Sequence, residues 1–175
     1  MFGEKGLVQI YTGNGKGKTT AALGIALRAS GHGAKIMMIQ FMKGWVHYGE
    51  LSGAKSIPSL TLIQTGRPDY VYKGQATEED YAEAARGVDL AENAMRTGSC
   101  DMLILDELNV ALDMGLVDTE RIVKLLKNKP FGMELILTGR DAKDEILALA
   151  DLVTEMREIR HPYQKGEIAR KGIEY

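Results

Sequence analysis

Short runs of apolar residues alternate with amphipathic segments along the whole chain. The centres of these runs, such as Leu103–Leu105, are continuously apolar, which is typical of strands buried on both faces of a parallel sheet. Six strands are predicted on this basis: Leu7–Thr12, Lys35–Phe41, Leu60–Gln64, Met102–Asp106, Leu135–Thr138 and Leu152–Met156. Strands that alternate with helices through right-handed crossovers predict an α/β sandwich of three layers with a mostly parallel sheet.

The clearest helical period runs from Glu78 to about Met95, where apolar residues recur on one face. Thr77, three residues before Asp80, is typical of a capping box at the start of this helix. Two shorter helices are predicted at Asp118–Lys127 and Lys143–Ala150.

Two stretches, Lys43–Pro58 and Gly66–Gln75, show no period and are predicted to be irregular. Loops of this length in a compact domain are more often functional than accidental, so both are candidates for a site. The polar tail Arg160–Tyr175 also shows no strong period.

Length and composition narrow the function classes. The 175 residues predict one domain, residues 1–175, and a net charge of −2 argues against binding to nucleic acid or a membrane surface. The single cysteine excludes an internal disulfide and a Cys-rich zinc site, and suits a reducing cytoplasm. No apolar run approaches the roughly 18 residues of a membrane span, and Met1–Lys5 does not begin like a signal peptide. We expect a cytoplasmic protein that acts on small molecules.

The glycine-rich segment Gly13–Thr20 follows a predicted strand and opens a predicted helix over Thr20–Ser30, which is the setting of a phosphate-binding loop. Glycines let the backbone approach phosphate oxygens, and the amides of the helix N-terminus point to the same spot. Lys18 would contact these oxygens, and the Thr19 hydroxyl would hold a Mg²⁺ ion. The loop is one residue shorter than the pattern Gly-x-x-x-x-Gly-Lys-Thr, so we expect the nucleotide to sit differently from usual.

Two acids, Asp106 and Glu107, end the apolar strand Met102–Asp106. In P-loop proteins an acid at this strand tip belongs to the magnesium shell. Glu107 is then either a general base acting on water or a ligand of metal or ribose. The alternative is a pair of solvated acids at a strand end.

The sequence resembles a known family, the P-loop ATP:corrinoid adenosyltransferases, which implies a P-loop NTPase fold of the RecA-like type. The resemblance covers nearly the whole chain from Leu7, and the short phosphate loop is a family trait. The matching stretches are Thr12–Ala22, Arg28–Gly33, Gln40–Gly44, Gly49–Glu50, Leu105–Leu108, Leu137–Arg140 and Lys165–Tyr175.

The resemblance implies that Co(I) of a corrinoid, such as cob(I)alamin, attacks C5′ of ATP and releases triphosphate. In the family ATP lies reversed, so that C5′ faces the nucleophile. The leaving group carries about four negative charges, so its departure needs preorganised cations and backbone donors. Mg²⁺ or Mn²⁺ is the implied cofactor, and a reductant protein such as a flavodoxin is the implied partner.

The resemblance also implies residue roles. Lys18 and Glu107 would be catalytic, and Thr19, Asp106 and Glu107 would hold the metal. The expected ATP-binding residues are Gly13, Asn14, Gly15, Lys16, Gly17, Lys18, Thr19, Thr20 and Arg28. For Arg28 the alternative is a helix-end cation that complements the helix dipole.

Corrinoid contacts are expected from Met42, Trp45, Tyr70 and Tyr72. The two tyrosines keep the spacing of a Phe-x-Trp pair that displaces the lower cobalt ligand in family members, although both residue types differ. The alternative is that they only anchor their loop. Some members of the family have a longer N-terminal arm that covers the corrinoid, whereas only Met1–Lys5 precede the first predicted strand here. We therefore expect closure over the corrinoid to come from elsewhere or to be incomplete, with an open cleft completed by a second subunit in a homodimer.

Other functions stay open at this stage. One is a P-loop ATPase with Glu107 as the base, although the short loop suits γ-phosphate hydrolysis poorly. Another is a non-catalytic module that binds ATP or a corrinoid. A small-molecule kinase is less well supported, because no lid or acceptor-base motif stands out.

Overall fold

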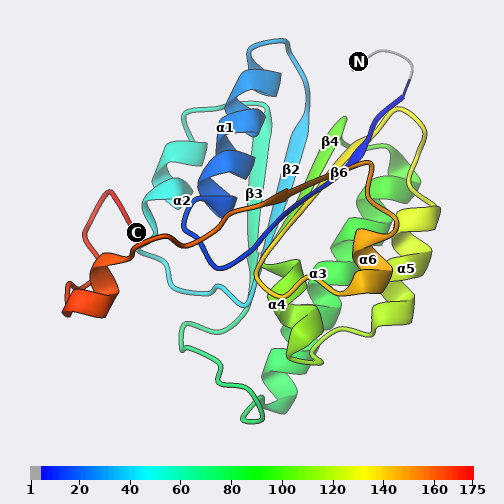
Figure 1. The fold of residues 1–175 in the computed structure, drawn as a ribbon. Helices are drawn as coiled ribbons and strands as arrows, with labels where there is room; N and C mark the ends of the chain where they lie inside the picture. Colours follow the sequence, from blue (N-terminus) through cyan, green and yellow to red (C-terminus); the bar gives the residue numbers. More distant parts are fainter. Residues whose placement is uncertain (1–4) are drawn as a thin grey trace.

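In a computed structural model, which describes residues 5–175, six strands form one sheet with helices on both faces (Figure 1). The strands are β1 (Val8–Thr12), β2 (Ile36–Phe41), β3 (Leu60–Thr65), β4 (Met102–Asp106), β5 (Glu134–Thr138) and β6 (Leu152–Glu155). Their order is β3-β2-β4-β5-β1-β6, and every neighbouring pair is parallel. The predicted α/β architecture of three layers is confirmed.

The helices divide between the two faces of the sheet. They are α1 (Lys18–Ser30), α2 (Gly49–Ala54), α3 (Glu78–Thr97), α4 (Leu108–Asp113), α5 (Thr119–Lys127) and α6 (Asp144–Leu147), followed by one 3₁₀ turn, η1 (Pro162–Lys165). Helices α1 and α2 cover one face, and α3, α4, α5 and α6 cover the other (Figure 1). None of the helices in residues 5–175 is long and apolar enough to cross a membrane.

Alternate residues of each strand supply two separate cores. Along β4, Met102 and Ile104 pack toward α1, whereas Leu103 and Leu105 pack toward α3 and α4. This follows from the two-residue period of a strand. Because both faces are covered, the middle positions of the central strands, such as Leu103–Leu105, are continuously apolar, and polar residues such as Gln40 and Asp106 lie near the strand ends.

The start of α3 is fixed as predicted. The amide of Thr77 donates to the Asp80 carboxylate at 2.8 Å, and the Thr77 side chain accepts from the Asp80 amide at 3.4 Å. Asp80 is buried and also accepts from the Arg67 guanidinium at 2.9 Å. This pair ties the loop after β3 to the first turn of α3.

Several sequence expectations are wrong. The stretch predicted to be irregular over 43–58 contains α2, and the helix predicted at Lys143–Ala150 is only the four residues of α6. Helix α4, which follows β4 almost at once, is not in the prediction. The prediction for Met1–Lys5 concerns mainly residues 1–4, which lie outside the described part.

Strand β6 also differs from expectation, because all four of its residues are exposed, including Leu152 at 40% and Val153 at 47%. The apolar run predicts burial on both faces. However, among the strands of residues 5–175, β6 lies at the edge of the sheet and pairs only with β1. The position of a strand in the sheet depends on the topology, which the local pattern does not encode.

Candidate active site

The carboxyl ends of β1, β2, β4 and β5 meet at one edge of the sheet, where ligands bind in open α/β folds. The phosphate loop follows β1, Lys43 follows β2, Glu107 follows β4 and Arg140 follows β5. Gln40 and Asp106 are register partners across β2 and β4. The topology therefore brings residues from four loops to one place.

The phosphate loop joins β1 to α1 and packs against the residue that follows β6. Gly13 and Gly17 have φ angles of 88° and 118°, in the region that suits glycine. A side chain on Gly13 would lie 2.6 Å from the carbonyl oxygen of Met156. That same oxygen accepts a hydrogen bond from the Gly15 amide at 2.6 Å. The glycine pattern of the loop therefore has a geometric cause.

Lys18, the first residue of α1, folds back under the phosphate loop. Its ammonium donates to the carbonyl oxygens of Gly13 at 2.7 Å and Gly15 at 2.8 Å, and the residue is 7% exposed. Burial lowers the pKa of Lys18 below its usual value, against the opposing charge of Glu107. Since an ammonium has three N–H donors, one remains for an anion beside the loop.

A cavity of about 560 Å³ opens next to this loop. It is lined by Asn14–Thr20, Leu23, Lys43, Tyr48, Gly49, Glu50, Glu107, Arg140, His161 and Gly172–Tyr175. Four of these side chains, Lys16, Lys18, Lys43 and Arg140, are cationic, and three, Glu50, Glu107 and Glu174, are carboxylates. A cavity of this chemistry suits a polyphosphate that binds together with a cation.

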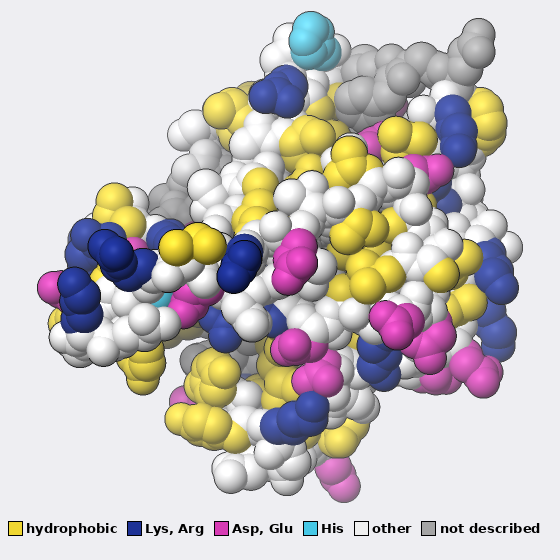
Figure 2. Space-filling model, viewed as in Figure 1, with side chains coloured by type: hydrophobic (Ala, Val, Ile, Leu, Met, Phe, Trp, Pro, Cys, Tyr) yellow, Lys and Arg dark blue, Asp and Glu magenta, His cyan; other side chains and the backbone are white. Residues whose placement is uncertain are grey.

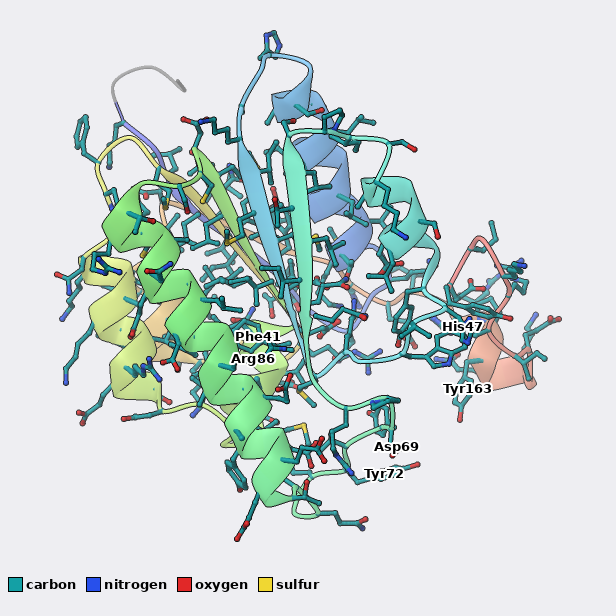
Figure 3. All side chains as sticks on the ribbon, turned by 180° about the vertical axis from the view of Figure 1, so that it is seen from behind. Phe41, His47, Asp69, Tyr72, Arg86 and Tyr163 are labelled. Carbon is teal, nitrogen blue, oxygen red and sulfur yellow. The ribbon has the colours of Figure 1, made fainter. Side chains whose placement is uncertain are left out.

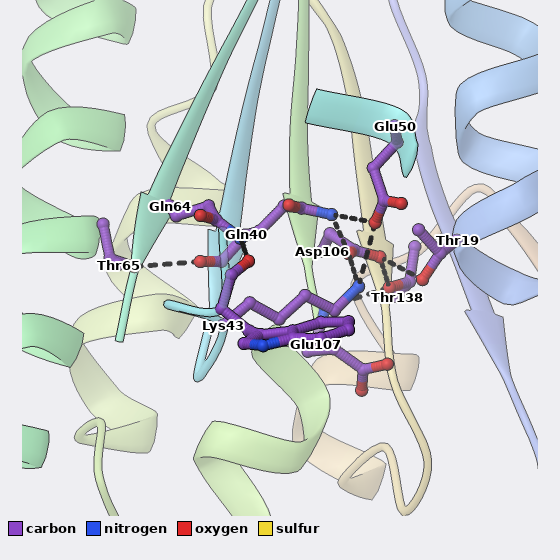
Figure 4. Close-up of polar contacts among 10 residues, drawn as sticks. Thr19, Gln40, Lys43, Glu50, Gln64, Thr65, Asp106, Glu107 and Thr138 are labelled. Atoms are coloured by element: carbon purple, nitrogen blue, oxygen red, sulfur yellow. Dashed lines mark hydrogen bonds and ion pairs between the residues drawn. The ribbon is translucent and has the colours of Figure 1, made fainter. Parts of the chain in front are cut away.

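Asp106 lies behind the cavity wall and organises its neighbours (Figure 4). One carboxylate oxygen accepts from the hydroxyls of Thr19 at 2.8 Å and Thr138 at 2.7 Å. The other accepts from the Lys43 ammonium at 2.8 Å and the Gln40 amide at 3.1 Å. Four donors satisfy the carboxylate, which is fully buried.

Glu107 contrasts with its neighbour, because its carboxylate faces the cavity and receives no hydrogen bond from residues 5–175. Its backbone has φ 61°, a left-handed conformation rare outside glycine. The backbone amide is held by the Thr138 hydroxyl at 3.0 Å. Burial raises the pKa of Glu107, and the charge of Asp106 adds to this effect. A left-handed backbone and a partly buried carboxylate with a raised pKa are features that functional side chains often share.

Replacing Glu107 by glutamine is expected to raise Tm by a few degrees in the absence of metal and nucleotide. Since the folded state raises the pKa of Glu107, the ionised carboxylate lowers stability. This loss of stability is absent below the unfolded-state pKa of Glu107, grows as the pH rises toward its folded-state pKa, and is complete above that value. Thermal unfolding in EDTA at about pH 5 and about pH 8 checks this, with the larger gain expected at about pH 8. A variant less stable than the wild type at both pH values contradicts the expectation.

The residues at this wall fit a magnesium ion in a specific way. Mg²⁺ is usually bound by one or two protein oxygens and completed by phosphate and water. Thr19 and Glu107 line the cavity and offer one hydroxyl and one carboxylate. Asp106 does not line it, and its oxygens are already engaged by four donors. Within residues 5–175, no group of three or more Asp, Glu, His or Cys side chains is placed to hold a metal ion. Phosphate and water oxygens would therefore complete the coordination of the ion.

The C-terminal tail, which shows no strong period in the sequence, lies against the phosphate loop. The Lys16 ammonium donates to the Ile173 carbonyl at 2.8 Å. The ring of Trp45 makes edge contacts with Tyr175 and with Tyr48, each at 5.2 Å between centroids. Trp45 therefore holds the tail against the loop after β2, and its two partners line the cavity.

A second hollow of about 370 Å³ adjoins the first and shares Gly15, Lys16, His161 and Glu174 with it. Three arginines line it: Arg157, Arg160 and Arg170. Figure 2 shows dark blue side chains gathered on the side where Figure 1 places the C-terminal segment. The hollow extends the same cleft with a strongly cationic wall.

The structure brings only some of the predicted site residues together. Arg28 lies at the exposed end of α1, ten residues and about 15 Å from Lys18, and does not line the cavity. Gly13 supports the cavity from behind, through its carbonyl bond to Lys18. Met42 packs against the core with φ 58° rather than facing the cavity.

Tyr70 and Tyr72 lie on the loop after β3, outside the cavity, and Figure 3 shows Tyr72 at the carboxyl edge of the sheet. Their rings contact each other edge to face at 4.9 Å, and they are 78% and 61% exposed. An exposed aromatic pair of this kind is available to a large flat ligand.

The sequence did not assign a site role to several cavity residues, among them Lys43, Tyr48, Glu50, Arg140 and Glu174. All except Tyr48 belong to stretches that match the adenosyltransferase family. The resemblance was the available signal, because local spacing does not show which loops meet.

Comparison with solved and curated proteins adds independent evidence. A solved structure, the flagellar accessory protein FlaH from Methanocaldococcus jannaschii, superposes with a TM-score of 0.60 over 87% of this chain and 71% of that one. At 10% identity this likeness concerns the fold alone, and it agrees with the expected RecA-like P-loop type.

Among curated proteins, a corrinoid adenosyltransferase from Sinorhizobium sp. is 36% identical and covers 98% of this chain and 81% of its own length. A corrinoid adenosyltransferase from Escherichia coli K12 is 37% identical, with 98% and 87% covered. Residues 4–175 also match the family model described as ATP:corrinoid adenosyltransferase BtuR/CobO/CobP. The chain therefore belongs to the ATP:corrinoid adenosyltransferase family.

Proposed function

We propose that this protein transfers the 5′-deoxyadenosyl group of ATP to the Co(I) of a reduced corrinoid, such as cob(I)alamin. Adenosylation of a corrinoid with ATP is the reaction of the family to which the chain belongs. In the proposed step Co(I) donates an electron pair to C5′ and becomes formally Co(III). The C5′–O bond breaks, and triphosphate leaves with the bonding pair.

The observation that carries this proposal is the combination of a short phosphate loop, a buried Lys18 and the cationic cavity beside them. Negative charge grows on the triphosphate as it leaves, so preorganised donors lower the barrier. Lys18 and the loop Gly13–Thr20 supply such donors, and Lys16 and Arg140 add charge at the same cavity. Lys18 is proposed as the main catalytic cation.

Mg²⁺ or Mn²⁺ is proposed as the cofactor, held by Thr19 and Glu107. When bound, the ion neutralises part of the phosphate charge. The Asp106 carboxylate accepts a hydrogen bond from the Thr19 hydroxyl and so leaves a lone pair of that oxygen free to face the cavity. Asp106 thus acts through Thr19 as a positioning residue, while Glu107 is the open carboxylate.

The corrinoid is proposed to lie across the open side of the cleft. Tyr70 and Tyr72 offer an exposed aromatic pair for it, and Trp45 packs against Tyr48 and Tyr175, which line the cavity. Met42, the first residue after β2, anchors that loop by packing against the core. Arg28 is proposed as a nucleotide contact on the family resemblance alone.

Replacing Tyr72 by alanine is expected to lower the fraction of four-coordinate Co(II) corrinoid about tenfold, because the ring shields one corrinoid face. ATP affinity is expected to change less than about twofold, since Tyr72 lies outside the cavity. Electron paramagnetic resonance of bound Co(II) and calorimetric ATP binding measure the two effects. Tyr81→Ala, at an exposed tyrosine on α3, is the matched control. An equal loss of both properties would indicate collapse of the loop instead.

The assembly and setting of the enzyme are further proposals. The 175 residues are proposed to act as one domain, within a homodimer in the cytoplasm. Exposed apolar residues on the edge strand β6, Leu152 and Val153, support self-association, and the single buried cysteine suits a reducing compartment. A flavodoxin-like protein is the proposed electron donor, and neither nucleic acid nor a membrane is a partner.

Hydrolysis of ATP at the γ-phosphate is the competing reaction. ³¹P NMR of the reaction mixture separates the two, because adenosyl transfer yields triphosphate whereas an ATPase yields ADP and phosphate. Triphosphate formation that requires Co(I) corrinoid is expected. ADP plus phosphate without triphosphate would overturn the proposed function.

A further inference from the structure

A lysine outside the phosphate loop occupies the carboxylate side of the cavity. Lys43 follows β2, lines the cavity and has a side chain that is only 15% exposed. Its ammonium lies 2.8 Å from Asp106 and 4.0 Å from Glu50 (Figure 4). Burial on its own lowers the pKa of Lys43, but the charge of Asp106 and the hydrogen bond to it outweigh this effect and raise the pKa.

The surroundings of this ammonium are built rather than incidental. The Gln40 amide donates to both carboxylates, at 3.1 Å to Asp106 and 3.2 Å to Glu50. This orientation leaves the buried Gln40 Oε1 without a partner in residues 5–175. A buried oxygen without a hydrogen-bond donor lowers the stability of the folded state. The fold therefore tolerates an unpaired oxygen while it holds Asp106 and Glu50 on either side of one cation.

Two carboxylates held this closely are also what a divalent ion binds, and paired metal sites are common in phosphate chemistry. Here the Lys43 ammonium already lies between them. Glu107, in contrast, faces the cavity without a hydrogen bond from residues 5–175. The two acids at the end of β4 are thus assigned to different cations.

We propose that Lys43 is a resident cation that takes the place of a second divalent ion between Asp106 and Glu50 and so limits the site to one metal. This inference rests on the proposed function, in which Thr19 and Glu107 hold that one ion. The Lys43 ammonium neutralises the two acids, as a second divalent ion would. Unlike such an ion, it has no open coordination positions that could bind the phosphates in a second, competing position. Lys43 is on this account a positioning residue of the site.

The test is the number of Mn²⁺ ions bound per chain, measured by electron paramagnetic resonance with Mn²⁺ alone. The wild type is expected to bind one ion. Lys43→Gln retains an N–H donor for Asp106 but removes the charge, and it is expected to bind one more. Removing a like charge a few ångströms away favours a divalent ion by at least about tenfold in affinity.

Three variants locate the effect. Lys43→Arg retains the charge and is expected to bind one ion, like the wild type. The double variant Lys43→Gln with Glu50→Gln loses a carboxylate and is expected to lose the extra ion. Lys73→Gln removes an exposed lysine that pairs with Asp113 at 2.8 Å, away from the cavity, and is expected to leave the count unchanged.

The outcomes separate this inference from the proposed function. If the wild type binds one ion and folded Lys43→Gln also binds one, the resident-cation role of Lys43 is wrong. If Lys43→Gln does not fold, Glu50→Gln decides: it should leave affinity for the single ion within about twofold. A loss of the ion in Glu50→Gln overturns the inference, because Glu50 would then be a metal ligand. A wild type that binds no Mn²⁺ contradicts instead the metal assigned in the proposed function.

Discussion

Replacing Lys18 by alanine is expected to lower kcat for adenosyl transfer by about a thousandfold. The Lys18 ammonium is buried beside the cavity and has one donor left after its bonds to Gly13 and Gly15. Removing it takes away a preorganised charge at the point where triphosphate leaves. It also frees two loop carbonyls, so the loop amides lose part of their fixed geometry.

The measurement is the anaerobic rate of adenosylated corrinoid formation at saturating ATP. Lys55→Ala is the matched control, since Lys55 is an exposed lysine at the end of α2 outside the cavity. Lys18→Arg retains the charge but not the shape, and it is expected to recover only part of the rate. Near-normal turnover in Lys18→Ala would show that this residue is not the main catalytic cation.

Replacing Asp106 by alanine is expected to lower the free energy of unfolding by about 3–5 kcal/mol. The substitution leaves the Lys43 ammonium without its closest carboxylate. It also removes the acceptor for Thr19, Thr138 and Gln40, of which Thr138 and Gln40 are fully buried. Each orphaned donor adds a desolvation cost.

Urea unfolding monitored by circular dichroism measures this loss. Asp113→Ala provides the comparison, because Asp113 forms an ion pair with Lys73 at the same 2.8 Å distance but at the surface. An exposed pair contributes at most about 1 kcal/mol. Equal effects of the two substitutions would contradict the central position of Asp106 in the network.

The parts of the fold that the sequence predicts are those with local causes. The apolar runs of β2 and β4 and the capping box at Thr77 were predicted because strand burial and helix capping depend on neighbouring residues. Helix α2 was missed because its six residues carry no apolar period and include two glycines. The exposure of β6 was missed because it depends on which strand lies at the edge.

The candidate site divides in the same way. The loop Gly13–Thr20 and the acids of β4 were predicted because each has a motif, and parallel strands bring their carboxyl ends together. The different surroundings of Asp106 and Glu107 depend on the positions of Thr138, at the end of β5, and Lys43, in the loop after β2. The contact of the C-terminal tail with the phosphate loop was missed for the same reason, because Lys16 and Ile173 are 157 residues apart in sequence.

The most direct test of the account is an anaerobic reaction with ATP and Co(I) cobalamin in which the light-sensitive alkyl product and triphosphate are quantified together. The two products are expected to form in equal amounts, and both are expected to vanish without the corrinoid or in Lys18→Ala. Consumption of ATP without the corrinoid, or ADP and phosphate in place of triphosphate, would contradict the proposed adenosyl transfer.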